Sequence, residues 1–198
     1  MDLPKIEKYF DKCFIVNNFE REAYHFKEIL KKKEIIHFVN RSSYTVLKKK
    51  TYKFFNINSI QMAAPFNLLD KNLMISFLIY KFFSLNVSTM PKYILHKFDY
   101  TGNKAYKNKF PNTGILSILY AAEILKVKNL YIIGLDFFTN DYFFKNEFSK
   151  GVASNYKKFV DLKIFEYFLE FINKNADTKF FLKTNYKFKI KPDNLILI

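Results

Sequence analysis

The sequence has no tryptophan, one cysteine, two arginines and four glycines among its 198 residues. The lone Cys13 excludes a disulfide within the chain and any cysteine-based zinc cluster, and it fits a reducing compartment. The first glycine is Gly102, and the chain has neither a Walker A loop nor a GxGxxG loop. It also lacks an HExxH motif, clustered histidines and an Asp-x-Asp pair, so we expect no metal and no cofactor.

The chain is rich in apolar residues, with 49% hydrophobic and 20% aromatic residues. That content is ample for a packed core and excludes intrinsic disorder as the default state. A length of 198 residues fits one domain, so we expect a single domain over residues 1–198.

The net charge is +15, and almost all the positive charge is lysine, because Arg21 and Arg41 are the only arginines. Lysine is abundant together with Asn, Ile, Phe and Tyr, which is typical of an AT-rich coding bias. Attraction to an anionic membrane or an anionic substrate is the second explanation. Nucleic acid is not an expected partner, because base and phosphate recognition favours the bidentate fork of arginine.

No apolar run follows Met1, so the sequence predicts no signal peptide. The most apolar stretch, residues 73–85, is 13 residues long and contains Lys81, whereas a membrane-spanning helix needs about 20 residues. We therefore expect a cytoplasmic protein, either free or held peripherally at the inner face of the cell membrane. Homo-oligomerisation is left open.

Short apolar runs alternate with helical patterns, without a linker or a repeat. This alternation predicts βαβ units, and hence an α/β, Rossmann-like, mostly parallel sheet with helices on both faces. The expected strands are 13–18, 35–40, 59–63, 130–134 and 179–182, and the expected helices are 20–33, 70–85, 112–127 and 161–173.

Short polar side chains follow three of the expected strands: Asn17 and Asn18, Asn40, and Asp136. Asparagine at a strand end is commonly a turn residue. In parallel sheets, however, ligands bind at the carboxyl ends of the strands, and amides can read both donor and acceptor edges of a pyrimidine or ribose. Both interpretations stay open for these residues.

Thr113 and Gly114 stand where the clearest helix begins. Thr113 is either a helix cap or part of a helix N-terminus that receives a phosphate or carboxylate, and the two roles are compatible. Further along, residues 139–157 are polar and aromatic and are long for a loop, so we expect a lid there, with Gly151 as its hinge.

The chain resembles the bacterial CMP-sialic-acid-dependent sialyltransferases of glycosyltransferase family 42. Residues 112–138 carry the main resemblance, with NTGIL at a helix start and LYIIGLDFF at a strand. Weaker motifs are LP…FD and VNNF within residues 3–19, FVN at 38–40 and DLKIFEYF at 161–168. The ordered set runs from about residue 3 to 185.

The resemblance implies a GT-A-like, metal-independent transferase that moves sialic acid or a related acidic sugar from a CMP-activated donor to a glycan, as in lipooligosaccharide biosynthesis. Asn17 and Asn18 would contact the nucleotide, and Asn40 its ribose or base. Thr113 and Gly114 would lie near the carboxylate or phosphate of the donor. The partners implied are the CMP-sugar and the glycan acceptor.

The sequence also departs from the family pattern. Phe138 stands where the family has a phosphate-holding tyrosine, whereas Tyr142 matches the second such tyrosine. Tyr156, with Asn155 beside it, stands where the family has its general-base histidine. The family's first strand and Gly-Asn-Gly-Pro-Ser loop would precede Met1, so we expect a truncated reading frame or a lost strand. The expectation is a truncated or inactive transferase.

A second family shares part of the pattern. The MptE-like (6-hydroxymethylpterin diphosphokinase-like) proteins have a similar TGxxxAxxxA…IxLxGxD arrangement but use acidic metal ligands. Only Asp136 and Asp141 are available for that purpose here. A diphosphokinase-like enzyme and a non-catalytic nucleotide-binding remnant are therefore the alternatives to a transferase.

Overall fold

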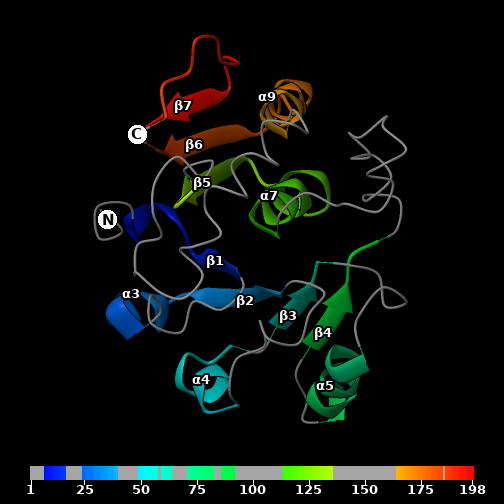
Figure 1. Cartoon of the computed structure of the whole chain (residues 1–198). Coiled ribbons are helices and arrows are strands. Elements are labelled where there is room, and N and C mark those ends of the chain that lie inside the picture. The colour runs from blue at the N-terminus through cyan, green and yellow to red at the C-terminus, as the bar shows by residue number, and fades with distance from the viewer. Residues whose placement is uncertain are drawn as a thin grey trace, which may run out of the picture. The chain divides into compact units, whose positions relative to one another are not determined.

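The computed structural model describes residues 7–16, 24–39, 49–57, 59–63, 71–82, 86–91, 113–135, 164–184 and 186–198. The chain divides into two compact units, Met1–Lys97 and Phe98–Ile198. Each unit is described by itself, with the elements labelled in Figure 1.

The first unit is built on a four-stranded parallel sheet in the order β1-β2-β3-β4. Each strand pairs with the one that precedes it along the chain, as in the pairings of Cys13 with Ile35 and of Ile60 with Val87. The strands are β1 (Lys12–Val16), β2 (Glu34–Val39), β3 (Ser59–Met62) and β4 (Asn86–Thr89), and the helices are η1 (Glu7–Tyr9), α3 (Lys27–Leu30), α4 (Lys49–Phe54) and α5 (Lys71–Phe82).

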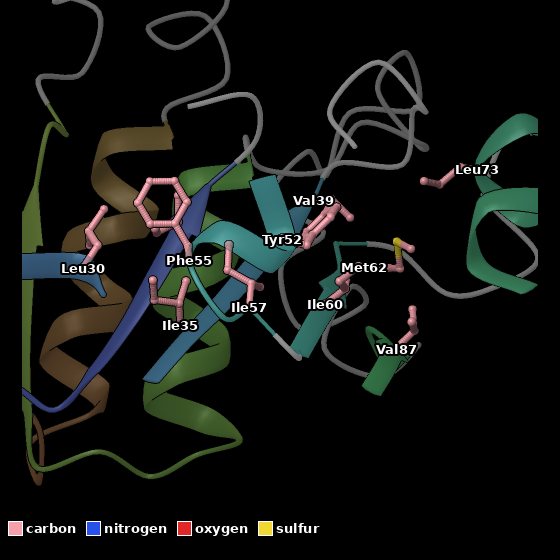
Figure 2. Close-up of a cluster of buried hydrophobic side chains, with 11 residues drawn as sticks. Leu30, Ile35, Val39, Tyr52, Phe55, Ile57, Ile60, Met62, Leu73 and Val87 are labelled. Atoms are coloured by element: carbon pink, nitrogen blue, oxygen red, sulfur yellow. The ribbon is translucent and has the colours of Figure 1, made fainter. Parts of the chain in front are cut away.

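The strands lie in the sheet in the same order as in the chain, so successive crossovers all move in one direction across the sheet. Because crossovers between parallel strands are nearly always right-handed, the connecting helices then lie on one face of the sheet. The buried cluster on that face confirms the arrangement, since Leu30 of α3, Phe55 directly after α4 and Leu73 of α5 all belong to it. Figure 2 shows Leu73 pointing from α5 toward the sheet. The other buried members are Ile15, Ile35, Val39, Tyr52, Ile57, Ile60, Met62 and Val87.

The opposite face of the same sheet carries Phe14, Phe38 and Gln61. Phe14 and Phe38 meet edge to face with ring centroids 6.2 Å apart. Gln61 is buried; its Nε2 donates to the carbonyl oxygen of Met62 at 3.1 Å, and its Oε1 accepts a hydrogen bond from Ser88 at 2.6 Å. The buried amide is therefore satisfied on both its donor and acceptor sides.

The second unit is built on a three-stranded parallel sheet in the order β5-β6-β7. Helix α9 covers one face of it, where Phe171 and Phe180 meet with ring centroids 6.2 Å apart. Tyr131 and Phe181 stack on the other face at 4.6 Å. The elements are α7 (Thr113–Glu123), β5 (Asn129–Ile133), α9 (Ile164–Lys174), β6 (Lys179–Lys183) and β7 (Leu195–Leu197).

The fold class is thus α/β, with parallel sheets that alternate with helices in Rossmann-like layers. The strands expected near residues 13, 35, 59, 130 and 179 are confirmed, with ends shifted by one or two residues at most positions. Of the helix expected over 20–33, the structure describes residues 24–33: residues 24 and 25 are helical, α3 spans Lys27–Leu30, and the helix ends before Lys33. Four of the described elements were not predicted: η1, α4, β4 and β7.

Two sequence predictions are not tested by the described residues. The lid predicted at 139–157 falls outside the described residues. The prediction of one domain over 1–198 stays a prediction. Among the described residues, no helix is long and apolar enough to cross a membrane.

Candidate functional site

The N-terminus of α7 carries the two candidate site residues that the structure describes, Thr113 and Gly114. Thr113 is buried and is the first residue of the helix, so the cap position is Asn112, which lies outside the described residues. The Ser117 hydroxyl donates to the carbonyl oxygen of Gly114 at 2.7 Å. The first backbone N–H groups of a helix have no partner within the helix and are available to an anion.

Helix α7 is held firmly at this end because most of its surface is buried. Buried residues lie on all sides of α7, which is typical of a helix that is covered from several directions. This burial fixes the position of its first turn. The buried residues are Thr113, Ile115, Leu116, Ser117, Ile118, Leu119, Ala121 and Ala122.

Strand β5 ends in a sharp turn at Gly134. This residue has φ of +79°, a left-handed conformation that side-chain-bearing residues rarely adopt. Nothing lies within 4 Å of where a Cβ would stand, so the backbone conformation rather than crowding explains the glycine. The turn directs the chain into Leu135 and then toward Asp136, which lies outside the described residues.

The first turn of α7 and the Gly134 turn lie at the same end of the second unit. The five residues between Glu123 and Asn129 make a short connection, so the strand runs back alongside the helix. Eleven helical residues and five strand residues each span about 16 Å, so the start of α7 and the end of β5 are level. Thr113 and Gly114 therefore stand at the carboxyl edge of the β5-β6-β7 sheet.

In the first unit, β1 and β2 also end at one sheet edge. Val16 is paired with Phe38, and β2 ends one residue later at Val39. The sequence continues from these ends into Asn17 and Asn40. The remaining candidate residues lie outside the described residues: Asn17, Asn18, Asn40, Asp136, Phe138, Tyr142, Asn155 and Tyr156.

Two histidines are described, and neither lies at these strand ends. His37 is completely buried, and its Nδ1 shares a 2.8 Å hydrogen bond with the hydroxyl of Tyr52, as expected for a structural histidine. His25 is exposed and makes an edge contact with the ring of Phe26.

Cys13 is a free cysteine in the described part of the chain. Burial against the hydrophobic cluster raises the pKa of its thiol to about 12, so the thiol is protonated at neutral pH. Within the described ranges, no group of three His, Cys, Asp or Glu side chains could hold a metal ion.

The sequence did not predict one polar pair in the sheet of the first unit. Gln61 and Ser88 face each other one residue before the ends of β3 and β4, with the hydrogen bond described above. The sequence feature that could have indicated this pair is a glutamine within the strand SIQM. Both amide atoms are engaged within the sheet, which is the pattern of a structural amide.

Comparisons of the chain with protein-family models, with curated proteins and with solved structures found no match.

Proposed function

We propose that this chain is a glycosyltransferase-like protein that uses a CMP-activated acidic sugar, such as CMP-sialic acid, with a glycan as acceptor. The observation that supports it is the position of Thr113 and Gly114 at the carboxyl edge of a parallel sheet. The motif that resembles the sialyltransferases includes these residues, and ligands of α/β proteins bind at this edge.

The chemistry of a CMP-activated acidic sugar suits such an edge. The donor carries a phosphodiester and a carboxylate, and a helix N-terminus offers N–H groups and a favourable dipole to either anion. A net charge of +15 draws anions toward any cleft. The resemblance would assign the nucleotide to Asn17, Asn18 and Asn40 and the phosphate to the Tyr142 hydroxyl.

Transfer requires the acceptor hydroxyl to attack the anomeric carbon while the bond from that carbon to the CMP oxygen breaks. The hydroxyl proton must pass to a base, and a well-placed base contributes about 10²–10⁴-fold to the rate. Tyr156 and Asn155 stand at the family's histidine position, and neither accepts a proton readily at neutral pH. The proposal therefore includes slow or absent turnover by the chain as it stands.

Nucleotide binding is the first test. Titration calorimetry with CMP should show binding to the full chain, and Thr113→Val should weaken it about tenfold by removing one hydrogen bond to a charged ligand. Ser76→Ala on α5 is the control, because it removes another hydroxyl from a helix of the other unit. A folded protein that ignores millimolar CMP contradicts the proposal.

Transfer is the second test, with CMP-sialic acid and a galactoside acceptor. Tyr156→His or Asn155→His should raise turnover. Robust turnover by the unmodified chain, unchanged by either substitution, would show that the catalytic position lies elsewhere. Nucleotide binding that depends on a divalent ion, with phosphoryl transfer, would favour the diphosphokinase alternative. CMP binding without turnover in every variant would identify a non-catalytic remnant.

A further inference from the structure

Helix α5 is apolar on the side that faces away from the sheet as well as on the side that packs against it. Its inner side places Leu73 in the buried cluster, with Met74 and Phe77 packed against it. On its outer side, Ile75, Leu78 and Ile79 are 56%, 60% and 46% exposed. These three positions have the i, i+3, i+4 spacing of one helical stripe, and we call them the α5 stripe.

Single exposed aliphatic side chains are ordinary on protein surfaces, but three adjacent ones on a helix already anchored by its other side are not. Helix α5 is already packed on the sheet through Leu73. The α5 stripe stays exposed in the folded unit. The free energy of burying its apolar surface can therefore stabilise a complex with a partner.

The part of the sequence that contains the α5 stripe is basic. Between Ile35 and Phe98 the sequence has one acidic residue, Asp70, against eight lysines and one arginine. Neither α4 nor α5 contains an acidic residue. Lys50 and Lys53 on α4 and Lys71 on α5 have exposed side chains.

Helices α4 and α5 lie on the same face of the β1–β4 sheet (Figure 1), since Phe55, directly after α4, and Leu73 of α5 belong to the cluster on that face. Their outer sides therefore face in the same general direction. On α4 the exposed surface includes an aromatic ring, since Phe54 is 40% exposed. The ammonium group of Lys31 lies 4.1 Å from the centre of that ring. The outer sides of these two helices thus carry both exposed lysines and exposed apolar side chains.

We propose that the outer surface of α4 and α5 docks on an anionic lipid bilayer. The α5 stripe enters the boundary between headgroups and acyl chains, and Lys50, Lys53 and Lys71 bind the lipid phosphates. Apolar insertion combined with lysine attraction is the usual physical basis of interfacial binding by amphipathic helices. This inference does not rest on the proposed function.

The charges favour this occupant over two others. A second copy docked through the same surface would bring lysine-rich helices against lysine-rich helices, and like charges oppose that contact. Nucleic acid would use the lysines but would leave the α5 stripe in water, because a phosphate backbone offers it no apolar surface. A bilayer with anionic headgroups satisfies both the charge and the apolar stripe.

The absence of tryptophan allows a direct test with single-tryptophan reporters in the full chain. Leu78→Trp places the fluorophore on the α5 stripe, and Ile190→Trp places it on a side chain 84% exposed in the other unit. Vesicles of phosphatidylcholine and phosphatidylglycerol in equal parts should shift the Leu78→Trp emission to the blue. Vesicles of phosphatidylcholine alone should not, and the Ile190→Trp emission should not move with either.

Flotation of the same vesicles measures the two contributions separately. The triple variant Ile75→Gln, Leu78→Gln, Ile79→Gln keeps good helix formers at exposed sites, and its partition should fall more than about tenfold. Lys50→Gln with Lys53→Gln should lower it about fivefold per lysine at low salt. The control, Lys187→Gln with Lys189→Gln, removes the same charge from exposed positions of the other unit and should have little effect.

Several outcomes would overturn the proposal. Equal loss in the control pair would mean that net charge alone drives binding. No blue shift on anionic vesicles, with the far-ultraviolet circular dichroism of the folded protein retained, would mean that the α5 stripe does not enter lipid. A lipid-free dimer that the triple glutamine variant dissociates would assign the surface to a second copy. Binding to duplex DNA that displaces the vesicles would assign it to nucleic acid.

Discussion

The Nδ1 atom of His37 and the hydroxyl oxygen of Tyr52 lie 2.8 Å apart inside the hydrophobic cluster of the first unit. Strand β2 supplies the imidazole and α4 the phenol, so this hydrogen bond joins the sheet to the helix that covers it. Both side chains are almost fully buried. A polar link at such a position fixes which turn of α4 faces β2, because any other alignment would separate the two groups in an apolar medium.

Tyr52→Phe should destabilise the protein by about 1–3 kcal/mol, because it takes one hydrogen-bond partner from a buried imidazole while leaving the ring packing intact. Urea unfolding measures the change in the free energy of unfolding. Tyr24→Phe is the matched control, since Tyr24 is partly exposed and packs its ring against Phe54 and Phe55. Equal effects of the two substitutions would argue against a specific role for the His37–Tyr52 bond.

Asn194 organises the second unit from its C-terminal segment. Its side-chain Nδ2 donates to the carbonyl oxygens of Ile172, Asn175 and Thr178 at 2.8, 3.0 and 3.1 Å. Asn194→Ala should cost about 1–3 kcal/mol, because carbonyl groups at the end of α9 lose their donor.

A second substitution at Asn194 tests the direction of these bonds. Asn194→Asp keeps the shape but replaces the donor with a carboxylate facing three carbonyl oxygens, so it should destabilise at least as much as alanine. Asn72→Ala on α5 is the control, because the side chain of Asn72 is exposed. Thermal unfolding of the three variants would rank them, and a stable Asn194→Asp protein would contradict the donor role.

The raised pKa of Cys13 predicts a specific loss of stability in alkali. Below its ordinary pKa of 9.0 the thiol is protonated in both the folded and the unfolded chain. Between 9.0 and about 12 only the unfolded thiol ionises, so the free energy of unfolding falls as pH rises. The slope contributed by this group approaches about 1.4 kcal/mol per pH unit.

Lysine and tyrosine side chains titrate in the same range, so the comparison must be with Cys13→Ala. The difference in unfolding free energy between the two proteins should be constant below pH 9.0 and should shrink above it. Native Cys13 should also react slowly with thiol reagents and rapidly once urea unfolds the chain. Rapid labelling of the native protein would show that the thiol is accessible and ionised.

The turn at Gly134 depends on backbone conformation alone. Gly134→Ala should cost about 1–2 kcal/mol, because an L-residue with a Cβ resists the left-handed conformation. Gly134→Asn should cost less, since asparagine tolerates that conformation, and Gly134→Val should cost more. Urea unfolding gives the order, and equal stability of all three variants would contradict the left-handed turn.

The sequence predicted the elements whose apolar pattern is long or continuous. The run LYIIG of β5 and the helix that begins at Thr113 are examples, because burial demands a repeated pattern over several residues. Strand β4 was missed because only Val87 of its four residues is buried, and one apolar residue has no period. Helix α4 was missed because its lysines are typical of a loop, whereas Tyr52 and Phe55 only become a helical face once they pack on the sheet.

The candidate site was predicted less completely than the fold. Thr113 begins a helix, as the sequence predicted. That Gly134 is left-handed could not be read from its position, because a glycine at a strand end is compatible with many turns. Gln61 was overlooked because its hydrogen bond depends on Ser88, a residue of the strand that the sequence did not predict.

The one-way order of β1 to β4 also bears on how the first unit is made. Paired residues of neighbouring strands lie only about 22 to 27 positions apart in the chain, a separation that favours rapid folding. Each strand leaving the ribosome finds its neighbour already synthesised, so the sheet can grow from β1 toward β4 during translation. In the second unit, β5 must wait for β6, whose partner residues lie about 50 positions later. The two halves of one polypeptide thus place different demands on the cell: the first can form as it emerges, and the second must be kept from aggregation until its partner strand arrives.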